Sequence, residues 1–130
     1  MIAVDTSALL AIAARESQAD ACIEAIKTAS EVLISAGTVT EALIVATRRG
    51  IAQDMQRLIE GLGLHVINVT PATAQRAAQA YAQWGKVIHP ASLNFGDCFS
   101  YAVAKEHDCP LLYVGGDFAR TDVKSALIDR

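Results

Sequence analysis

Short apolar runs alternate along this chain with longer stretches that have helical spacing. The first run, Ile2–Val4, stops at Asp5, and Thr6 and Ser7 then supply helix-capping hydroxyls before the apolar stretch 8–13. This order predicts a strand, a polar turn and a helix. Further apolar runs predict strands at 32–35, 65–69 and 111–114, and residues 125–128 predict a short edge strand.

The segments between these runs have the end signals of helices. Thr70 followed by Pro71 pairs a capping hydroxyl with a proline at the first helical position, and the alanine-rich stretch after it predicts a helix to Trp84. Gly50 is placed to stop another helix. The expected helices cover residues 8–13, 17–29, 37–49, 53–62, 71–84 and 94–107.

Strands that alternate with helices predict βαβ units, and therefore an α/β fold with a mostly parallel sheet and helices on both faces. The 130 residues suit one domain, spanning 1–130. Apolar residues make up 52% of the chain and aromatic residues only 5%, so we expect a core of aliphatic side chains. In such folds, ligands bind at the carboxyl ends of the strands.

Charge and cysteine content narrow the classes of function. The formal net charge is −3, so the overall field of the molecule would not attract a polyanion and any contact with nucleic acid must be local. Cys22, Cys98 and Cys109 have no zinc-ligand spacing and are typical of reduced thiols. The first residues lack the basic region of a signal peptide, and we expect a cytoplasmic protein without a membrane span.

Four acids stand where this fold would bring side chains to one edge of the sheet. Asp5 directly follows the first strand and Asp117 lies just past the fourth, while Glu41 and Asp97 lie near the starts of two predicted helices. Each acid alone is explained by capping or solvation. Together they predict one acidic pocket, in which a pair of carboxylates at ~4 Å would repel by roughly 4 kcal/mol at an effective dielectric of 20. A cation or shifted pKa values must relieve that repulsion.

Oxygen ligands without His or Cys favour Mg²⁺ or Mn²⁺ over zinc. Such ions polarise a phosphate and activate water, so the acids predict phosphodiester hydrolysis with carboxylates as ligands and one of them as a base. Thr6 and Ser7 have two open roles, capping the first helix or bonding to a metal-bound water. Asn94 is a candidate to hold the loop before Asp97, and Gly96 permits close backbone approach.

The residues around these acids resemble those of the VapC toxins, which are PIN-domain proteins of bacterial toxin–antitoxin pairs. The resemblance spans nearly the whole chain and is carried by four blocks in order: Val4–Leu9, Thr38–Ala42, Leu93–Phe99 and Leu112–Asp122. It implies a three-layer α/β/α sandwich, a Mg²⁺- or Mn²⁺-dependent endoribonuclease, a homodimer, and a VapB-type antitoxin whose C-terminal segment covers the active site. Asp5, Glu41 and Asp97 match the core acids of the family, and Asp117 matches the acid that precedes Phe in the last block.

Gly116 departs from the family pattern, because many relatives carry Asp or Asn at that position. If that side chain supports a second metal ion in the relatives, two outcomes are open here: the second ion is bound weakly, or Asp117 or Asp122 substitutes for the missing side chain. The sequence therefore does not decide whether the site holds one metal ion or two.

An RNA substrate requires positively charged partners for its phosphates, and Arg120 and Arg48 are the candidates we single out. No histidine is assigned a catalytic role. Tyr81 and Trp84, three residues apart, are expected to pack in the core or at a dimer interface rather than on RNA, and we favour the dimer interface.

Two other functions remain open at this level. One is a PIN fold that binds RNA or its antitoxin without cutting, which the Gly116 departure allows. The other is a receiver-like signalling domain, which also gathers acids around Mg²⁺. A receiver needs a Lys after a late strand, whereas the fourth strand here runs into Gly115 and Gly116. The RNA target cannot be read from the sequence.

Overall fold

Four parallel strands form the centre of the computed structural model, which describes residues 1–127. They are β1 (Ile2–Val4), β2 (Val32–Ser35), β3 (His65–Ile67) and β4 (Leu111–Leu112), in the order β3-β2-β1-β4. The two central strands are fully buried. All four strands run in one direction, so their carboxyl ends share one edge of the sheet.

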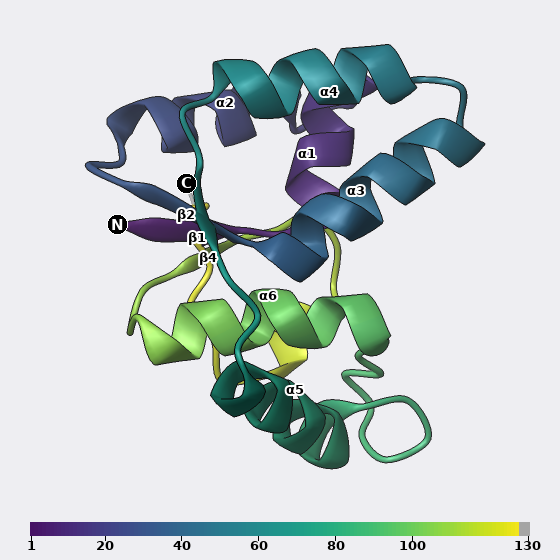
Figure 1. Ribbon diagram of the computed structural model, residues 1–130, viewed down its shortest axis with the longest axis vertical. Coiled ribbons are helices and arrows are strands. Elements are labelled where there is room, and N and C mark those ends of the chain that lie inside the picture. Colours follow the sequence, from purple (N-terminus) through teal and green to yellow (C-terminus); the bar gives the residue numbers. More distant parts are fainter. Residues whose placement is uncertain (128–130) are drawn as a thin grey trace.

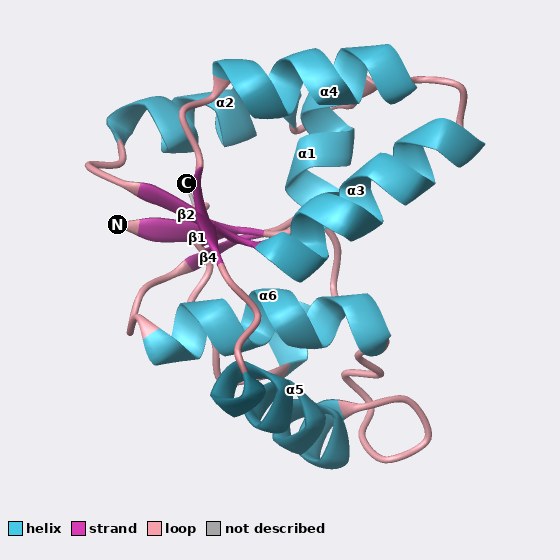
Figure 2. Cartoon of the chain, viewed as in Figure 1, coloured by secondary structure: helices cyan, strands magenta, loops and turns pink. Residues whose placement is uncertain are grey.

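Helices cover both faces of this sheet, as Figures 1 and 2 show. One face carries α1 (Thr6–Ala13), α2 (Ala19–Thr28), α3 (Ala36–Arg48) and α4 (Ala52–Gly61). The other face carries α5 (Pro71–Trp84) and α6 (Phe95–Glu106), and a short 3-10 helix, η1 (Phe118–Arg120), follows β4. The predicted three-layer α/β/α sandwich is confirmed.

The core divides into two clusters because successive side chains of a strand point to opposite faces. Ile2, Val4 and Ile34 pack with Leu9 and Met55 on the α1–α4 side. The residues between them on the strands point the other way: Ala3, Leu33 and Leu111 pack against Leu93 and Val103 near α5 and α6. A run of consecutive apolar residues, each buried on one side or the other, is therefore what this sheet requires.

Two strands are shorter than the sequence predicts, since each ends where its partner ends. Ile67 pairs with Ser35, the last residue of β2, so residues 68 and 69 have no strand to pair with. Leu112 likewise pairs with Val4, the last residue of β1. The apolar pattern runs on past the point where hydrogen-bonding partners stop.

The chain ends differ from the prediction in two further ways. The first helix begins at Thr6 rather than after Ser7, because Asp5 is its N-cap residue. Of the edge strand predicted at 125–128, the structure has one parallel bridge between Ser125 and Leu111, and residue 128 lies outside the described residues. Within 1–127, none of the helices has the length and apolar character needed to cross a membrane.

Candidate active site

Asp5 is the most enclosed of the four predicted acids, with 3% of its surface exposed at the end of β1. One carboxylate oxygen accepts hydrogen bonds from the backbone N–H of Ser7 (3.0 Å) and from Ser7 Oγ (2.7 Å). The other accepts from Ser100 Oγ at 2.6 Å. Three donors therefore fix the carboxylate at the carboxyl edge of the sheet. Asp5, rather than Thr6 or Ser7, is the N-cap residue of α1, and Ser7 donates hydrogen bonds to the Asp5 carboxylate.

Ser100 and Thr38 belong to this site, although the sequence reading did not select them. Both are buried, and their hydroxyls lie 3.1 Å apart. Because the Ser100 hydroxyl donates to Asp5, it accepts from the Thr38 hydroxyl. A chain of hydrogen bonds therefore runs from Thr38 on α3 through Ser100 on α6 to Asp5, the residue after β1. Helical spacing is the sequence feature that could have identified them. Ser100 stands three residues after Asp97 and Thr38 three before Glu41, so each shares a helix face with an acid.

Glu41 extends from α3 toward the start of α6. Its Oε1 accepts a hydrogen bond from Thr6 Oγ1 at 2.5 Å. The carboxylate lies so close to Gly96 that a Cβ atom at that position would overlap it. Burial raises the pKa of Glu41, the bond from Thr6 opposes the rise, and the charge of Asp5 adds to it. The sequence left open whether Gly96 is a turn residue or allows close approach, and the structure supports close approach.

Adding a methyl group at Gly96 is expected to displace Glu41. For Gly96→Ala we expect a loss of about 1–3 kcal/mol in the free energy of unfolding, typical of overpacking. Gly61, which is also helical but has open space around its Cα, is the matched control, and Gly61→Ala should not destabilise. Urea unfolding checks both. In a Glu41→Ala background the cost of Gly96→Ala should vanish, and a full cost there would contradict the contact.

Asp97 is the third residue of α6 and forms a reciprocal cap with Asn94. The Asn94 N–H donates to Asp97 Oδ2 (3.0 Å), and the Asp97 N–H donates to Asn94 Oδ1 (2.9 Å). Asn94 thus holds the loop before Asp97, as predicted. The pKa of Asp97 is raised to about 7. Burial is the largest cause, the bond from the Asn94 N–H opposes the rise, and the charges of Asp5, Glu41 and Asp117 add to it. The other three acids therefore lie close enough to Asp97 for their charges to raise its pKa.

This raised pKa predicts how stability depends on pH in the absence of metal. A carboxyl with a pKa of about 7 when folded and about 3.9 when unfolded stabilises the fold below pH ~4, and that stability is lost as the pH rises through 7. In EDTA, the free energy of unfolding of Asp97→Asn should rise by about 2 kcal/mol relative to that of wild type as the pH goes from 4 to 8. This figure is discounted for the partial exposure of Asp97. Asn can still accept the capping bond. Unfolding curves that differ by a constant at every pH would contradict this expectation.

Asp117 is exposed and precedes η1. Together with Asp5, Ser7 and Asp97 it lines a cavity of about 290 Å³, whose remaining wall is the segment Val114–Phe118. Phe118 anchors this segment, since its buried ring packs on Tyr113 with ring centroids 5.3 Å apart. Asp117 therefore faces the same space as Asp5 and Asp97. Gly116 adds only backbone to the wall of the cavity.

The donor set suits a hard divalent cation, because it consists of carboxylate and hydroxyl oxygens. Within residues 1–127, no group of three or more His, Cys, Asp or Glu side chains is already arranged to hold a metal ion. Asp5, Glu41 and Asp97 each accept hydrogen bonds from the protein. An ion would thus compete with these donors, and it would relieve the repulsion that raises the pKa of Asp97.

Asp122 does not join the acids, contrary to the supporting role considered for it. It accepts hydrogen bonds from the Tyr101 hydroxyl (2.6 Å) and from Lys105 Nζ (3.1 Å), which lower its pKa. The Tyr101 hydroxyl in turn accepts from Trp84 Nε1 at 3.0 Å. Asp122 therefore ties the C-terminal segment to α6. Trp84 contacts this segment through Tyr101, and a place for Tyr81 and Trp84 at a dimer interface stays a prediction.

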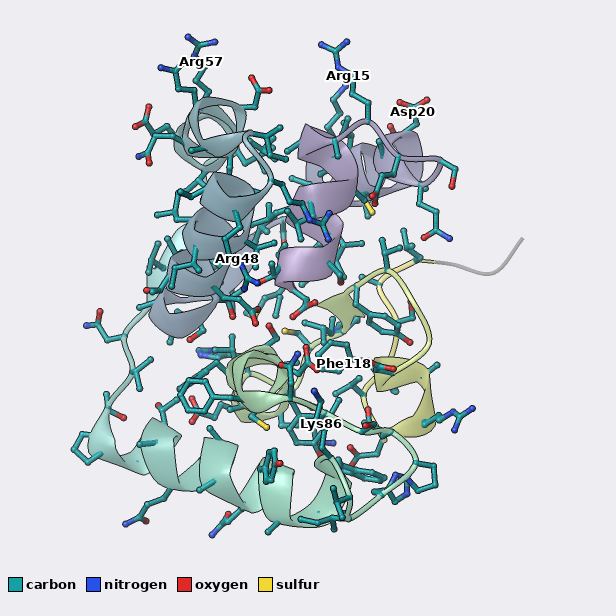
Figure 3. The ribbon with its side chains drawn as sticks, turned by 90° about the vertical axis from the view of Figure 1, so that its right-hand side faces the viewer. Arg15, Asp20, Arg48, Arg57, Lys86 and Phe118 are labelled. Carbon is teal, nitrogen blue, oxygen red and sulfur yellow. The ribbon has the colours of Figure 1, made fainter. Side chains whose placement is uncertain are left out.

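The two arginines chosen as RNA contacts lie on different layers. Arg48 is exposed in the last turn of α3, and Figure 3 shows it on the α1–α4 side of the sheet. Arg120 is exposed in η1, on the other side, and its guanidinium donates to the backbone oxygen of Pro90 at 3.4 Å. An RNA role for either residue stays a prediction.

This combination of a parallel sheet between helical layers and acids at its carboxyl edge matches a known family. The model of the PIN domain family matches residues 2–124, nearly the whole chain. The chain therefore belongs to the PIN-domain family. The receiver-like alternative falls with this finding.

Proteins of similar sequence show to which group within this family the chain belongs. Ribonuclease VapC42 of Mycobacterium tuberculosis is 39% identical over 127 residues, which cover 95% of this chain and 97% of the relative. Ribonuclease VapC28 of the same organism is 41% identical over 128 residues, covering 95% and 96%. At this similarity the chain is one of the VapC ribonucleases.

Solved structures agree on the fold. The crystal structure of M. tuberculosis VapC20, described as a sarcin–ricin loop cleaving toxin, superimposes with a TM-score of 0.77 at 19% identity, covering 95% of this chain and 96% of that one. A toxin–antitoxin complex from Klebsiella pneumoniae gives a TM-score of 0.72 at 18% identity, covering 99% and 97%.

Proposed function

We propose that this VapC ribonuclease is a Mg²⁺- or Mn²⁺-dependent endoribonuclease and the toxin of a toxin–antitoxin pair. The observation that carries the metal-dependent part is the cavity at the carboxyl edge of the sheet, which Asp5, Asp97 and Asp117 line together. Glu41 adds its charge from α3, since it raises the pKa of Asp97. Four acids from four segments of the chain converge where an α/β sheet binds its ligands.

In this proposal Asp5 and Asp97 hold the first ion, with Glu41 and Asp117 completing the oxygen ligands. When bound, the ion supplies a Lewis acid for the scissile phosphate and an activated water as nucleophile. Ser7 and Ser100 orient Asp5, and Thr6 orients Glu41. Binding of the ion would lower the pKa of Asp97 from its metal-free value of about 7, so that the carboxylate is ionised as a ligand at neutral pH. Gly116 offers no side chain to a second ion, so one strongly held ion is expected.

The proposed partners are an RNA substrate, a VapB-type antitoxin and a second copy of the chain. Support for an antitoxin comes from similar solved structures, which include the Klebsiella pneumoniae complex and VapBC2 from Rickettsia felis bound to a promoter DNA fragment. The antitoxin is proposed to cover the acidic cavity with its C-terminal segment. Sedimentation of the purified protein tests the homodimer.

Expression in a bacterial host tests the toxin role. Wild-type protein should arrest growth, and co-expression of a small protein encoded beside its gene should relieve the arrest. The Asp5→Asn variant should be harmless. Normal growth with the wild type, or arrest by Asp5→Asn, would contradict the proposal.

A further inference from the structure

The stretch of chain that leads from β4 to Asp117 carries no side chain that could anchor it. The N–H of Val114 donates to Ser7 Oγ at 3.0 Å, which fixes the chain as it leaves the strand. Gly115 and Gly116 follow, and a Cβ atom at either position would meet open space in the described part of the chain. Asp117 is therefore positioned from its C-terminal side.

The turn that begins at Asp117 is joined by its own hydrogen bonds. The N–H of Arg120 donates to the carbonyl oxygen of Asp117 at 3.2 Å. Thr121 donates twice to the carbonyl oxygen of Phe118, through its N–H (3.0 Å) and through its hydroxyl (2.7 Å). The ring of Phe118 is buried in the core. Because these bonds join the turn into one unit, a contact that holds Asp122 at its far end also fixes the direction of Asp117.

Asp122 fastens this turn to α6, the helix that carries Asp97. Its carboxylate accepts a hydrogen bond from the Tyr101 hydroxyl at 2.6 Å. That hydroxyl accepts in turn from Trp84 Nε1 at 3.0 Å, so a donor on α5 orients it. Tyr101 stands four residues after Asp97, about one helical turn further along α6. The bond between Tyr101 and Asp122 thus joins the two segments that bring Asp97 and Asp117 to the acidic cavity.

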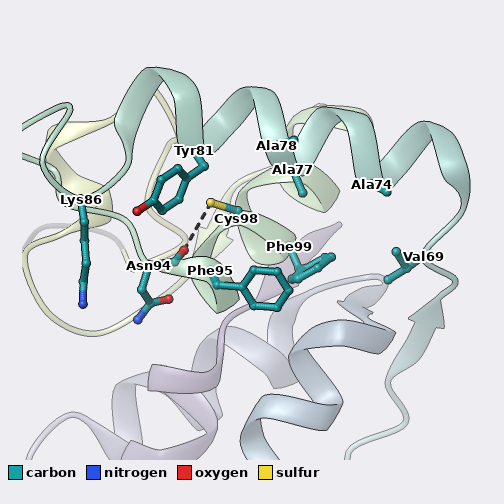
Figure 4. A pocket seen from close by; sticks show the side chains of 10 residues that line it. All are labelled: Val69, Ala74, Ala77, Ala78, Tyr81, Lys86, Asn94, Phe95, Cys98 and Phe99. Atoms are coloured by element: carbon teal, nitrogen blue, oxygen red, sulfur yellow. Dashed lines mark hydrogen bonds between the residues drawn. The ribbon is translucent and has the colours of Figure 1, made fainter.

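The start of α6 has separate support. Asn94 forms the reciprocal cap with Asp97, and its backbone oxygen accepts a hydrogen bond from Cys98 Sγ at 3.3 Å, which Figure 4 marks with a dashed line. Asp97 is therefore held by its own helix, whereas Asp117 depends on the contact at Asp122. Breaking that contact is expected to displace one acid of the cavity and to leave the other in place.

We propose that Tyr101 and Asp122 are positioning residues, which together hold the carboxylate of Asp117 toward the acidic cavity. The inference rests on the proposed function, in which Asp117 is a metal ligand. Residues behind metal ligands orient them, and their loss typically weakens metal binding by about 10- to 100-fold. Asp122 acts on the site through the turn, without being a ligand itself.

The affinity for Mn²⁺, measured by titration calorimetry, tests this role. Tyr101→Phe keeps the ring and removes the hydroxyl, and it should weaken Mn²⁺ binding by about 10-fold, the lower end of the range for residues behind metal ligands. In an Asp117→Asn background the same change should cost less than about 2-fold, because the ligand that Tyr101 positions is already gone.

Tyr81→Phe is the matched control, since it also removes one hydroxyl from a tyrosine ring. Tyr81 lies on α5 and lines a separate pocket, shown in Figure 4, and none of the residues that line this pocket borders the acidic cavity. Tyr81→Phe should bind Mn²⁺ with the affinity of wild type.

Two variants at Asp122 separate the hydrogen bond from the charge. Asp122→Ala and Asp122→Asn both remove the carboxylate charge and the ion pair with Lys105. Only Asn can still accept a hydrogen bond from Tyr101. Asp122→Asn should therefore bind Mn²⁺ nearly as wild type does, and Asp122→Ala should bind it as weakly as Tyr101→Phe. Equal losses in the two variants would assign the effect to charge and overturn the proposal.

Amide hydrogen exchange in EDTA tests the same contact without metal. The amides of Arg120 and Thr121 donate within the turn, and in Tyr101→Phe they should exchange about 10-fold faster than in wild type, as expected for loss of a hydrogen bond to a charged acceptor. Amides of β1 and β2 report unfolding of the whole domain and should change less. An equal change at all of these amides would show a general structural role and overturn the proposal.

Tyr101→Phe that binds Mn²⁺ as tightly as wild type would also overturn the proposal. A loss of affinity as large in the Asp117→Asn background as in the wild-type background would do the same, because the effect would then not pass through Asp117. Wild type that binds no Mn²⁺ would instead refute the proposed metal-dependent function. The exchange of the Arg120 and Thr121 amides would then support or overturn the contact on its own.

Discussion

Replacing Asp5 by Asn is expected to lower the rate of RNA cleavage by about 10³-fold, because a lost ligand forfeits several kcal/mol of transition-state stabilisation at about 1.4 kcal/mol per tenfold change in rate. The side chain keeps its shape, so Asn can still accept a hydrogen bond from Ser100. The substitution removes the charge of the most buried of the four acids. Single-turnover cleavage of a mixed-sequence RNA in Mn²⁺ measures the effect.

Asp20 provides the control for this experiment. It is an exposed acid in the first turn of α2, and Figure 3 shows it at the outer end of the helical layer. Asp20→Asn removes the same charge from the molecule and should cleave at the wild-type rate. Equal losses in both variants would point to net charge rather than to the cavity, and full activity in Asp5→Asn would remove Asp5 from the reaction.

Mn²⁺ is expected to stabilise the wild-type fold through the same acids. An ion that binds the folded state alone adds about 2.7 kcal/mol to the free energy of unfolding at a concentration 100 times its dissociation constant. The gain should be larger at pH 7.5 than at pH 5.5, because the ion must displace the proton that Asp97 holds below its pKa of about 7. Urea unfolding at the two pH values measures the gain.

Asp97→Asn should lose most of this stabilisation while staying folded, since the reciprocal cap with Asn94 requires only an oxygen acceptor at position 97. Its smaller gain should also be independent of pH. A variant that gains as much from Mn²⁺ as wild type would place the ion elsewhere on the molecule.

The sequence was sufficient to predict the layers of the fold and the place of the acids. Each depends on local pattern: apolar runs set the strands, and Asp5 follows its strand directly. The cap between Asn94 and Asp97 is equally local, because it joins residues three apart at a helix start. Such features survive folding since neighbours along the chain remain neighbours in space.

What the sequence did not predict depends on contacts between distant segments. Ser100 bonds to Asp5 across 95 positions, and the approach of Glu41 to Gly96 follows from how α3 packs against α6. Asp122 was considered a reserve ligand because it lies near Asp117 in the chain. Its hydrogen bond to Tyr101, 21 residues away, turns it from the cavity. Strand ends were misjudged for the same reason, since a strand stops where its partner stops.

Metal removal tests the central claim most directly. Wild-type protein should cleave single-stranded RNA in Mg²⁺ or Mn²⁺, lose all measurable cleavage when EDTA chelates the ion, and recover it when excess Mn²⁺ is restored. Cleavage that continues undiminished in EDTA would contradict the account, because the acids at the carboxyl edge of the sheet would then have to act without the ion proposed to join them.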